Sequence, residues 1–355
     1  MNSHPIVSSL TNAITARAEL FDARHEVAFR LFNGFFEGDP DLVVDLYART
    51  ILLHNYADPP QQASMIKCVQ QELLKQLPWV RAIVLKTRNA PTHQGRCGVI
   101  LYGEKVDRQI REPSRGVRYA IDLLMNRDAS FYLDTRNLRA WALKKLAGKS
   151  VLNTFAYTGS LGVAAMAAGA SRVVHTDLNR TFLNVAKTSY TLNGFPIKRA
   201  DFKVGDFWSL INRLKREGER FDCVILDPPF FAKSKKGTIN MLTDSHRLIN
   251  KVRPLINDGG YLVAINNALF LSGAAYIETL ERLCADGYLS IEELIPIPPD
   301  FIGYAETRIG KLPVDPAPFN HATKIAVLRV RQDQQVRIFG PLNLGVKTLG
   351  VKTPS

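Results

Sequence analysis

The sequence predicts an α/β protein in which a doubly wound, seven-stranded sheet follows a smaller N-terminal α+β domain. From about Lys149 onward, short β-rich runs alternate with amphipathic helices and Gly-bearing turns, a pattern typical of parallel βα units. Before that point, several β-rich runs follow one another directly, which indicates a small antiparallel sheet. A length of 355 residues suits two such domains.

The N-terminal region begins with one amphipathic helix between Ser8 and about Arg24, because its apolar residues recur at helical spacing. We expect residues 1–25 to hold this helix and residues 26–125 to form the α+β domain. Its expected strands are Ala28–Phe32, Leu42–Leu46, Thr50–Asn55, Ala82–Lys86 and Val99–Tyr102, and its helix runs from about Gln61 to Gln76.

Residues 126–332 form the larger domain. The expected strands are Ser150–Thr154, Arg172–Thr176, Asp201–Val204, Cys223–Leu226, Gly260–Asn266, Leu289–Pro296 and Lys324–Arg331. The expected helices are Leu161–Ala168, Thr181–Asn193, Ser209–Glu217 and Asp244–Val252. Residues 333–355 contain a near repeat of Leu-Gly-Val-Lys-Thr, and we expect them to form a loose tail.

Composition excludes several classes of protein. No apolar run approaches the ~18 residues of a membrane span, and the N-terminus lacks the pattern of a signal peptide. We therefore expect a soluble, cytoplasmic protein. Its four cysteines are scattered without C-x-x-C spacing, so we expect neither a disulfide nor a structural metal.

The positive charge is concentrated in one part of the α+β domain. The chain has 46 Lys and Arg against 33 Asp and Glu, and residues 81–118 alone hold nine basic and three acidic residues. Such a cluster indicates a surface that faces phosphates, although a solvated basic face fits the charge equally well. We expect Arg108, Arg111 and Arg115 to bind substrate, which makes this domain the substrate-binding one.

Four motifs follow consecutive strands of the larger domain. They are Val151-Leu-Asn-Thr-Phe-Ala-Tyr-Thr-Gly-Ser-Leu-Gly162, Asp177, Gly205-Asp206-Phe207 and Asp227-Pro-Pro-Phe-Phe231. Ligands of open α/β sheets bind beyond the carboxyl ends of the strands, so these residues are candidates for one site. Asp177 is placed to accept hydrogen bonds from ribose hydroxyls, and Asp206 with Phe207 is placed to bind an adenine ring.

With these motifs, the sequence resembles the class I S-adenosylmethionine-dependent methyltransferases, which share a Rossmann-like seven-stranded sheet. It is similar in particular to large-subunit ribosomal RNA methyltransferases that modify cytosine carbon-5 or guanine nitrogen-7. Phe131-Tyr-Leu-Asp-Thr-Arg136 also carries the likeness, which extends from about Ala28 to about Arg331. Relatives often begin with an RNA-binding PUA domain, and too few residues precede Ala28 to form one.

The resemblance implies S-adenosyl-L-methionine as the cofactor and RNA as the partner. The cofactor-binding residues that it implies are Tyr132, Asp134, Arg136, Asn153, Phe155, Tyr157, Thr158, Gly159, Asp177, Leu178, Asp206, Phe207 and Asp227.

The type of acceptor atom depends on whether a cysteine lies at the site. Methylation of a pyrimidine carbon needs a thiolate that adds to the ring, whereas a base nitrogen attacks the methyl group directly. Asn266 and Asn267 stand where the cytosine-type relatives have cysteine, so we favour a guanine nitrogen. The expected catalytic residues are Asp227, Pro228, Pro229 and Phe230, and Phe231, Lys233, Lys235, Asn266 and Asn267 are expected to contact the substrate.

Other functions remain open at this point. Amino-group methyltransferases that act on DNA or protein also carry Asp-Pro-Pro-Phe, and a catalytically silent RNA-binding assembly factor could share the fold. A nicotinamide-dependent dehydrogenase is disfavoured because the turn lacks the G-x-G-x-x-G pattern. The oligomeric state, monomer or homodimer, is left undecided by the sequence.

Overall fold

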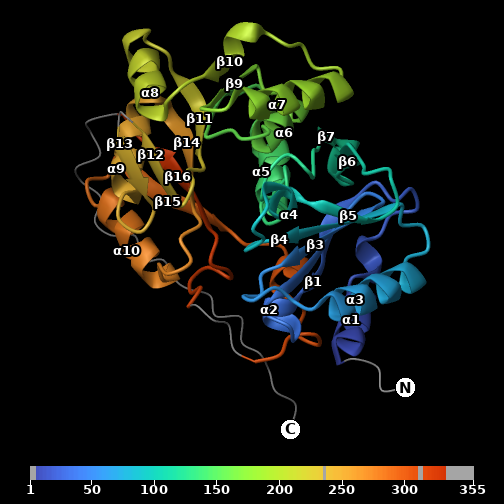
Figure 1. Cartoon of the computed structure of the whole chain (residues 1–355). Helices are drawn as coiled ribbons and strands as arrows, with labels where there is room; N and C mark the ends of the chain where they lie inside the picture. Colours follow the sequence, from blue (N-terminus) through green and yellow to red (C-terminus); the bar gives the residue numbers. More distant parts are fainter. Residues whose placement is uncertain (1–4, 235–236, 311–314, 333–355) are drawn as a thin grey trace.

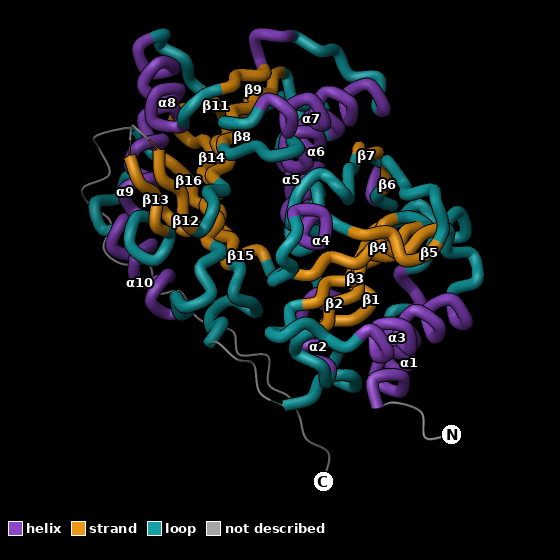
Figure 2. Tube along the Cα trace, in the orientation of Figure 1, coloured by secondary structure: helices purple, strands orange, loops and turns teal. Residues whose placement is uncertain are grey.

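The computed structural model describes residues 5–234, 237–310 and 315–332, which form two large sheets and two short hairpins with helices packed around them (Figure 1). The N-terminal sheet has five strands and the C-terminal sheet has seven. The predicted α/β fold with a smaller N-terminal α+β unit is confirmed. Figure 2 shows the strands of the two sheets on either side of the loops that join them.

The five-stranded sheet is built by β1 (Ala28–Asn33), β2 (Leu42–Tyr47), β3 (Thr50–Asn55), β4 (Ala82–Thr87) and β5 (Val99–Tyr102), which lie side by side in chain order. Helices α1 (Pro5–Ala16) and α3 (Ala63–Gln76) cover one face of it (Figure 1). The expectation of an antiparallel sheet is wrong for one pairing, since β3 and β4 run parallel. The chain returns through α3 before β4 begins, and such a crossover gives parallel strands.

Shorter elements complete this half of the chain. They are η1 (Ala18–Leu20), α2 (Gly34–Glu37), α4 (His93–Cys97), β6 (Gln109–Arg111), η2 (Ser114–Gly116) and β7 (Arg118–Ala120). The first helix ends at Ala16 rather than near Arg24, because the side chain of Arg17 turns into the protein interior and the chain continues as η1.

The seven-stranded sheet comprises β8 (Ser150–Thr154), β9 (Arg172–Asp177), β10 (Phe202–Val204), β11 (Phe221–Leu226), β14 (Ile256–Asn266), β15 (Leu289–Ile295) and β16 (Lys324–Val330). Their order is β10-β9-β8-β11-β14-β16-β15, and β16 alone runs antiparallel to both of its neighbours. The carboxyl ends of the parallel strands therefore meet at one edge, as the spacing of the motifs predicts.

Helices cover both faces of this sheet (Figure 1). On one face lie α5 (Arg136–Lys145), α6 (Ser160–Ala167) and α7 (Arg180–Leu192), and on the other lie α8 (Phe207–Arg216), α9 (Ser245–Val252) and α10 (Gly273–Cys284). Neighbouring strand residues serve the two faces alternately: Leu152 packs toward α8 and α9, whereas Val151 packs toward α5 and α6. Both faces are buried, which is why these strands read as almost continuous apolar runs.

A hairpin not expected from the sequence follows the fourth strand of this sheet. It is formed by β12 (Phe231–Ser234) and β13 (Gly237–Asn240), which pair antiparallel. The remaining elements are η3 (Arg199–Asp201), η4 (Arg253–Leu255) and α11 (Pro299–Ile302). The expected tail at residues 333–355 lies outside the described residues. No helix in the described ranges is long and apolar enough to span a membrane.

The two sheets are joined by a shared apolar core. Tyr47 and Leu52 of the five-stranded sheet pack in one cluster with Tyr119 and Phe131, and this cluster also contains Leu183 of α7. The segment between the sheets thus contacts both of them, and our proposed domain boundary near residue 125 falls inside it. This packing fixes the position of one sheet relative to the other.

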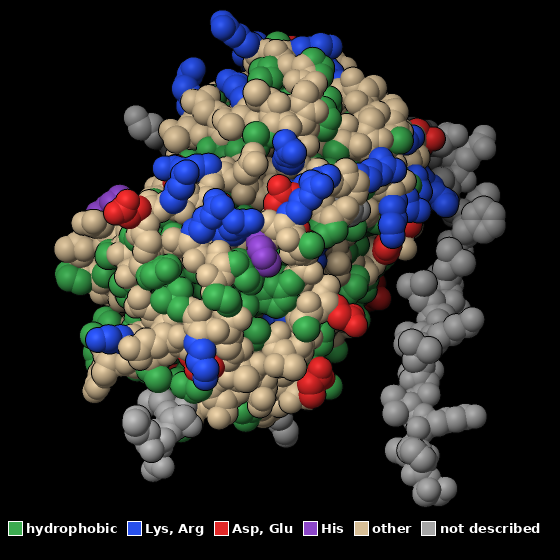
Figure 3. Space-filling model, turned by 90° about the vertical axis from the view of Figure 1, so that its right-hand side faces the viewer, with side chains coloured by type: hydrophobic (Ala, Val, Ile, Leu, Met, Phe, Trp, Pro, Cys, Tyr) green, Lys and Arg blue, Asp and Glu red, His purple; other side chains and the backbone are tan. Residues whose placement is uncertain are grey.

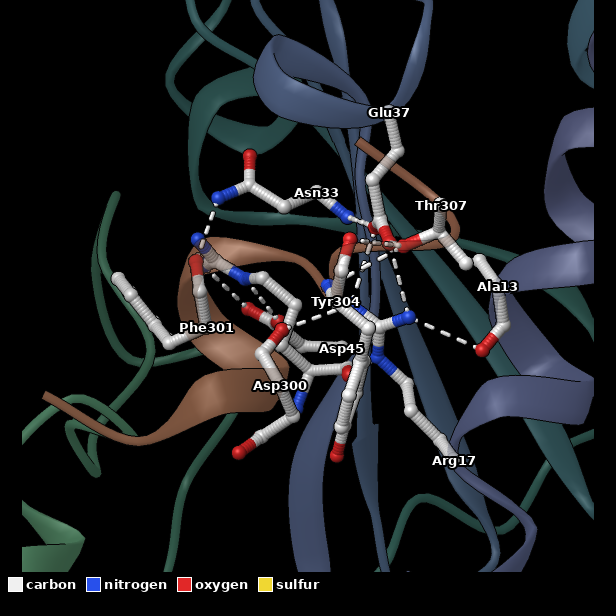
Figure 4. A network of polar contacts seen from close by, with 10 residues as sticks. Ala13, Arg17, Asn33, Glu37, Asp45, Asp300, Phe301, Tyr304 and Thr307 are labelled. Atoms are coloured by element: carbon white, nitrogen blue, oxygen red, sulfur yellow. Dashed lines mark hydrogen bonds and ion pairs between the residues drawn. The ribbon is translucent and has the colours of Figure 1, made fainter. Parts of the chain in front are cut away.

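A buried polar network reinforces the junction (Figure 4). The guanidinium of Arg17, which is 0% exposed, donates hydrogen bonds to both carboxylate oxygens of Glu37 at 3.0 Å and to the carbonyl of Asp300 at 2.8 Å. Thr307 also donates to Glu37, and the carboxylate of Asp300 pairs with Arg136 of α5. The network therefore ties α1 and α2 to the 300–307 segment and to α5.

Replacing Arg17 tests how much this network stabilises the fold. Arg17→Met leaves the Glu37 carboxylate buried without its partner, so we expect the free energy of unfolding to fall by about 3–5 kcal/mol. Arg213→Met is the control, because Arg213 pairs with Glu217 at the surface and such pairs contribute about 0–1 kcal/mol. Urea denaturation of both variants measures the difference, and equal losses would contradict a stabilising role for the network.

Candidate functional site

Residues from both sheets line one cavity of about 830 Å³. The strand ends of the larger sheet contribute Phe155, Tyr157, Thr176, Asp177, Leu178, Gly205, Asp206, Phe207, Asp227, Pro228, Pro229, Phe230, Ile265 and Asn267. The five-stranded sheet and the loops after β3 and β4 contribute Arg30, Asp45, Tyr47, His54, Tyr56 and Arg88. The strand-end motifs of the larger sheet and one wall of the α+β domain therefore line the same cavity.

Asp177 is held rigidly at the end of β9. Its Oδ2 accepts a hydrogen bond from the backbone N–H of Tyr157 at 2.8 Å, and its Oδ1 accepts one from the N–H of Asn179 at 2.8 Å. Each carboxylate oxygen can accept a second hydrogen bond, so adjacent hydroxyl groups of a ligand could bind to both. At the next strand end, Asp206 caps α8 by accepting from the N–H of Ser209 at 3.2 Å, and it also lines the cavity.

Aromatic rings form flat surfaces beside these carboxylates. Phe155 and Tyr157 follow β8 with φ angles of 52° and 50°, a left-handed conformation that is uncommon for residues other than glycine. The ring of Phe155 stacks on that of Phe207 with 4.6 Å between centroids, and the Tyr157 hydroxyl donates to the carbonyl of Ala129 at 3.0 Å. These surfaces suit a planar aromatic ligand group.

Two further carboxylates, Asp134 and Asp227, line the cavity, and neither forms an ion pair with another described residue. Asp134 accepts a hydrogen bond from the Thr323 hydroxyl at 3.2 Å, and its other oxygen has no hydrogen-bond partner among the described residues. Burial raises the pKa of Asp134, and burial together with the Asp134 charge raises the pKa of Asp227 to about 7. A ligand that places a positive charge here would relieve both effects.

The wall from the five-stranded sheet is polar and aromatic. Arg30 donates to both oxygens of Asp45, at 2.8 and 3.1 Å, and Nε2 of His54 lies 3.5 Å from the same carboxylate. Burial raises the pKa of Asp45, but Arg30 and His54 outweigh burial and bring it to about 2. The ring of Tyr56, 39% exposed, stacks beside His54, and the Arg88 guanidinium lies 5.8 Å from its centroid.

Sequence analysis missed this wall. Its residues stand in or directly after runs that read only as strands, and they meet the strand-end motifs only through packing of the two sheets. Asp45 and His54 give a weak signal, because a charged side chain inside an apolar strand needs a partner. His321 and Thr323, which also line the cavity, were missed for the same reason.

Four of the predicted cofactor-binding residues, together with Asn266, do not line the cavity and have structural roles instead. They are Arg136, which pairs with Asp300; Asn153, whose amide nitrogen lies 3.4 Å from Nδ1 of His175; Thr158, which donates to the Ser130 carbonyl; Gly159; and Asn266. A Cβ on Gly159 would lie 2.5 Å from Ala186, so this glycine permits close packing of α6 against α7. Asn266 donates to the carbonyl of Met241 and accepts from the N–H of Ala268.

Only some of the predicted substrate-binding residues line the cavity. Lys233 and Asn267 line the cavity, whereas Phe231 is 58% exposed and does not line it. Arg108, Arg111 and Arg115 also lie outside the cavity lining; Arg108 pairs with Asp122 at 3.1 Å and Arg111 with Glu26 at 3.5 Å. Lys235 is outside the described residues.

All four cysteines lie outside the cavity lining. Cys97 and Cys223 are buried, and Cys68 and Cys284 are half-buried. Burial raises the pKa of the Cys223 thiol, and that of Cys284 to about 11. None of the four is therefore placed as a thiolate nucleophile in the cavity. Within the described ranges, no group of three or more His, Cys, Asp or Glu residues could hold a metal ion.

The chain is similar to known proteins over most of its length. Residues 30–306 match a family model described as S-adenosylmethionine-dependent methyltransferase. The chain is 31% identical over 309 residues to "Putative ribosomal RNA large subunit methyltransferase YwbD" of Bacillus subtilis, covering 83% of this chain and 75% of the relative. It is 30% identical over 272 residues to ribosomal RNA large subunit methyltransferase I of Vibrio campbellii, covering 74% and 67%.

A solved structure shows the same fold. The crystal structure of SMU.776, described as "a putative methyltransferase complexed with SAH", superposes with a TM-score of 0.77 at 22% identity. The superposition covers 93% of this chain and 82% of the other. Since the family match spans most of the chain and is supported by both relatives, the chain belongs to the S-adenosylmethionine-dependent methyltransferase family.

Proposed function

We propose that this protein transfers the methyl group of S-adenosylmethionine to a nitrogen of an RNA base, with guanine in large-subunit ribosomal RNA as the favoured acceptor. The observation that carries the proposal is the composition of the cavity. One half presents aromatic rings and carboxylates that form no ion pair within the described part of the chain, the other presents an aromatic and arginine-bearing wall, and no cysteine lines either half. The names of the relatives support ribosomal RNA as the substrate.

The residues of the cavity fit the cofactor. Asp134 and Asp227 would face its positive charges, since both carboxylates lack an ion-pair partner in the described chain. Asp177 would accept hydrogen bonds from the ribose hydroxyls, and Asp206 and Phe207 would bind the adenine. When bound, the cofactor supplies an electrophilic methyl group attached to a sulfonium.

The protein's part in the reaction is mainly positioning. Residues of this chain would hold the acceptor nitrogen of the base in line with that methyl group. In-line placement of donor and acceptor supplies most of the rate enhancement for such a transfer. Asp227 and the backbone near Pro228 would hold the base edge, Phe230 would stack on the base, and Asn267 would add a polar contact.

The wall of the five-stranded sheet would hold the acceptor from the other side. Tyr56 is an exposed aromatic ring on the cavity, and Arg88 lies beside it with a charge that suits a phosphate. The Arg30–Asp45 pair sits beneath them and keeps this wall in place. A DNA or protein amino group remains the second candidate acceptor, and the same transfer assay with DNA or protein distinguishes it.

Cofactor affinity should depend on the ionisation of Asp227. Because its pKa is about 7, the carboxyl must lose a proton before it can face a cation, so affinity falls as the pH drops below 7. The dissociation constant should rise by up to about tenfold per pH unit there. Asp227→Asn should weaken binding and flatten this profile in calorimetric titrations from pH 5.5 to 8.5. A parent protein whose affinity is constant over that range would refute the assignment.

Methyl transfer should not need a cysteine. With Cys68, Cys97, Cys223 and Cys284 all replaced by Ala, the protein should methylate an unmodified large-subunit ribosomal RNA transcript at the parent's rate, once matched for folded fraction. Tritium transfer from labelled S-adenosylmethionine measures the rate. Loss of activity in the folded variant, or a covalent complex with fluorocytosine-containing RNA, would show that carbon methylation takes place instead.

Tyr56 should contribute to RNA binding through stacking. Tyr56→Ala removes a base–aromatic contact worth about 1–3 kcal/mol, so KM for the transcript should rise by roughly 5- to 150-fold. Cofactor affinity should not change, and Tyr56→Phe should keep the parent's KM. Phe35→Ala is the control, since Phe35 is 46% exposed on α2 and lines neither the cavity nor the arginine-bearing pocket. An effect of Phe35→Ala equal to that of Tyr56→Ala would exclude a specific contact.

A further inference from the structure

A second, smaller pocket of about 220 Å³ lies apart from the cavity, and the two have no lining residue in common. Its walls carry five arginines, Arg24, Arg49, Arg81, Arg111 and Arg118. Of the arginines that the sequence singled out as substrate-binding, only Arg111 is among them. Arg81, Arg111 and Arg118 belong to the basic stretch 81–118, and the fold adds Arg24 and Arg49 from outside it.

Four separate segments bring these side chains together. Arg111 and Arg118 stand opposite each other in the β6–β7 hairpin. Arg49 occupies the turn between β2 and β3, and its carbonyl accepts the backbone N–H of Arg81, which directly precedes β4, at 2.8 Å. Arg24 comes from the loop after η1. The backbone structure thus fixes the Cα position of each of these arginines.

The positive charge of the pocket is largely uncompensated. Glu26 pairs with Arg111 at 3.5 Å, and the Asp107 carboxylate accepts from the backbone N–H of Arg49 at 3.0 Å and from the Thr50 hydroxyl at 2.8 Å. Arg24, Arg49, Arg81 and Arg118 form no ion pair among the described residues. A pocket lined by charges of one sign raises the local concentration of counter-ions, which are anions here. Arginine matches phosphate in particular, because its planar fork donates two parallel hydrogen bonds.

The position of the pocket relates it to the cavity. Arg49 directly precedes β3, and Tyr56 follows its far end; Arg81 directly precedes β4, and Arg88 directly follows it. At about 3.3 Å per residue, six-residue strands place the two sites roughly 20 Å apart. The same two strands therefore hold the pocket at one end and the acceptor wall at the other.

We propose that this arginine pocket binds backbone phosphates of the RNA substrate at a distance of several nucleotides from the acceptor base. The inference rests on the proposed function, because it takes RNA as the substrate. Figure 3, which shows the side that carries β5 and α3 in Figure 1, has Lys and Arg side chains gathered across it more densely than Asp and Glu. A polyanion that follows this face meets positive charge along its path.

The test removes charge from the pocket without touching the cavity. The variant Arg49→Gln/Arg81→Gln/Arg118→Gln leaves the Arg111–Glu26 pair intact. The control Lys144→Gln/Arg216→Gln/Arg220→Gln removes the same charge from exposed positions that line neither site. A third variant with lysine at positions 49, 81 and 118 keeps the charge, and thermal unfolding verifies that each variant is folded.

The probe is an unmodified large-subunit ribosomal RNA transcript, titrated at several salt concentrations. Three lost phosphate contacts should reduce the slope of log K against log salt by about 2 and weaken binding by roughly ten- to a hundredfold at 0.1 M salt. The lysine variant should keep the parent's slope, the control should match the parent, and cofactor affinity and kcat at saturating RNA should be unchanged in all of them.

Each other outcome overturns the inference. If the glutamine variant matches the control while the parent methylates the transcript, the pocket does not bind RNA and the proposed function stands. If the variant loses only binding of inorganic phosphate, measured by calorimetry, the pocket is a site for a small anion. If the parent neither binds nor methylates RNA, the proposed function fails as well.

Discussion

The buried ion pair between Arg17 and Glu37 is the constraint on which the rest of the structure depends. Neither side chain reaches water, so each charge is tolerable only because every neighbour donates or accepts a hydrogen bond in the right place. The 300–307 segment supplies part of that shell through Asp300 and Thr307. A shift of this segment relative to the N-terminal sheet would break several of these contacts at once. The network therefore holds the two sides of the cavity in a fixed relative position.

The fixed relative position of the two sides is important for ligand binding, because the two sides of the cavity differ in chemistry. Asp134 and Asp227, which form no ion pair with any described residue, lie on the side of the cavity formed by the larger sheet, and the Arg30–Asp45 pair lies on the opposing wall. Burying these two carboxylates without an ion-pair partner destabilises the ligand-free protein. A cationic ligand removes this desolvation penalty when it binds, which contributes to its binding free energy. A methyl group between the two sides would be approached from the side that carries the aromatic wall.

The sequence predicted the larger sheet well, since parallel βα units repeat locally. It also predicted that Asp177, Asp206 and Asp227 follow strands at one edge of that sheet, where all three line the cavity. It could not predict the opposing wall, because Asp45 and Tyr56 reach the cavity only through contacts between distant parts of the chain. Asn266 shows a second limit. The sequence does not distinguish an asparagine that contacts a ligand from one that forms hydrogen bonds with backbone groups. Asn266 is of the second kind, since it bonds to the backbone of Met241 and Ala268. The hairpin after Phe230 was missed because its strands are only four residues each.

The left-handed backbone at Phe155 and Tyr157 has a consequence for how this protein can change. Such a conformation costs about 1–3 kcal/mol for each residue other than glycine. Glycine at either position would relieve strain, yet it would also delete a ring from the cavity wall. Selection for thermal robustness alone would therefore push these two sites toward glycine, and selection for ligand binding would hold them aromatic. In the turn after β8, stability and ligand binding thus favour different residues at the same two positions.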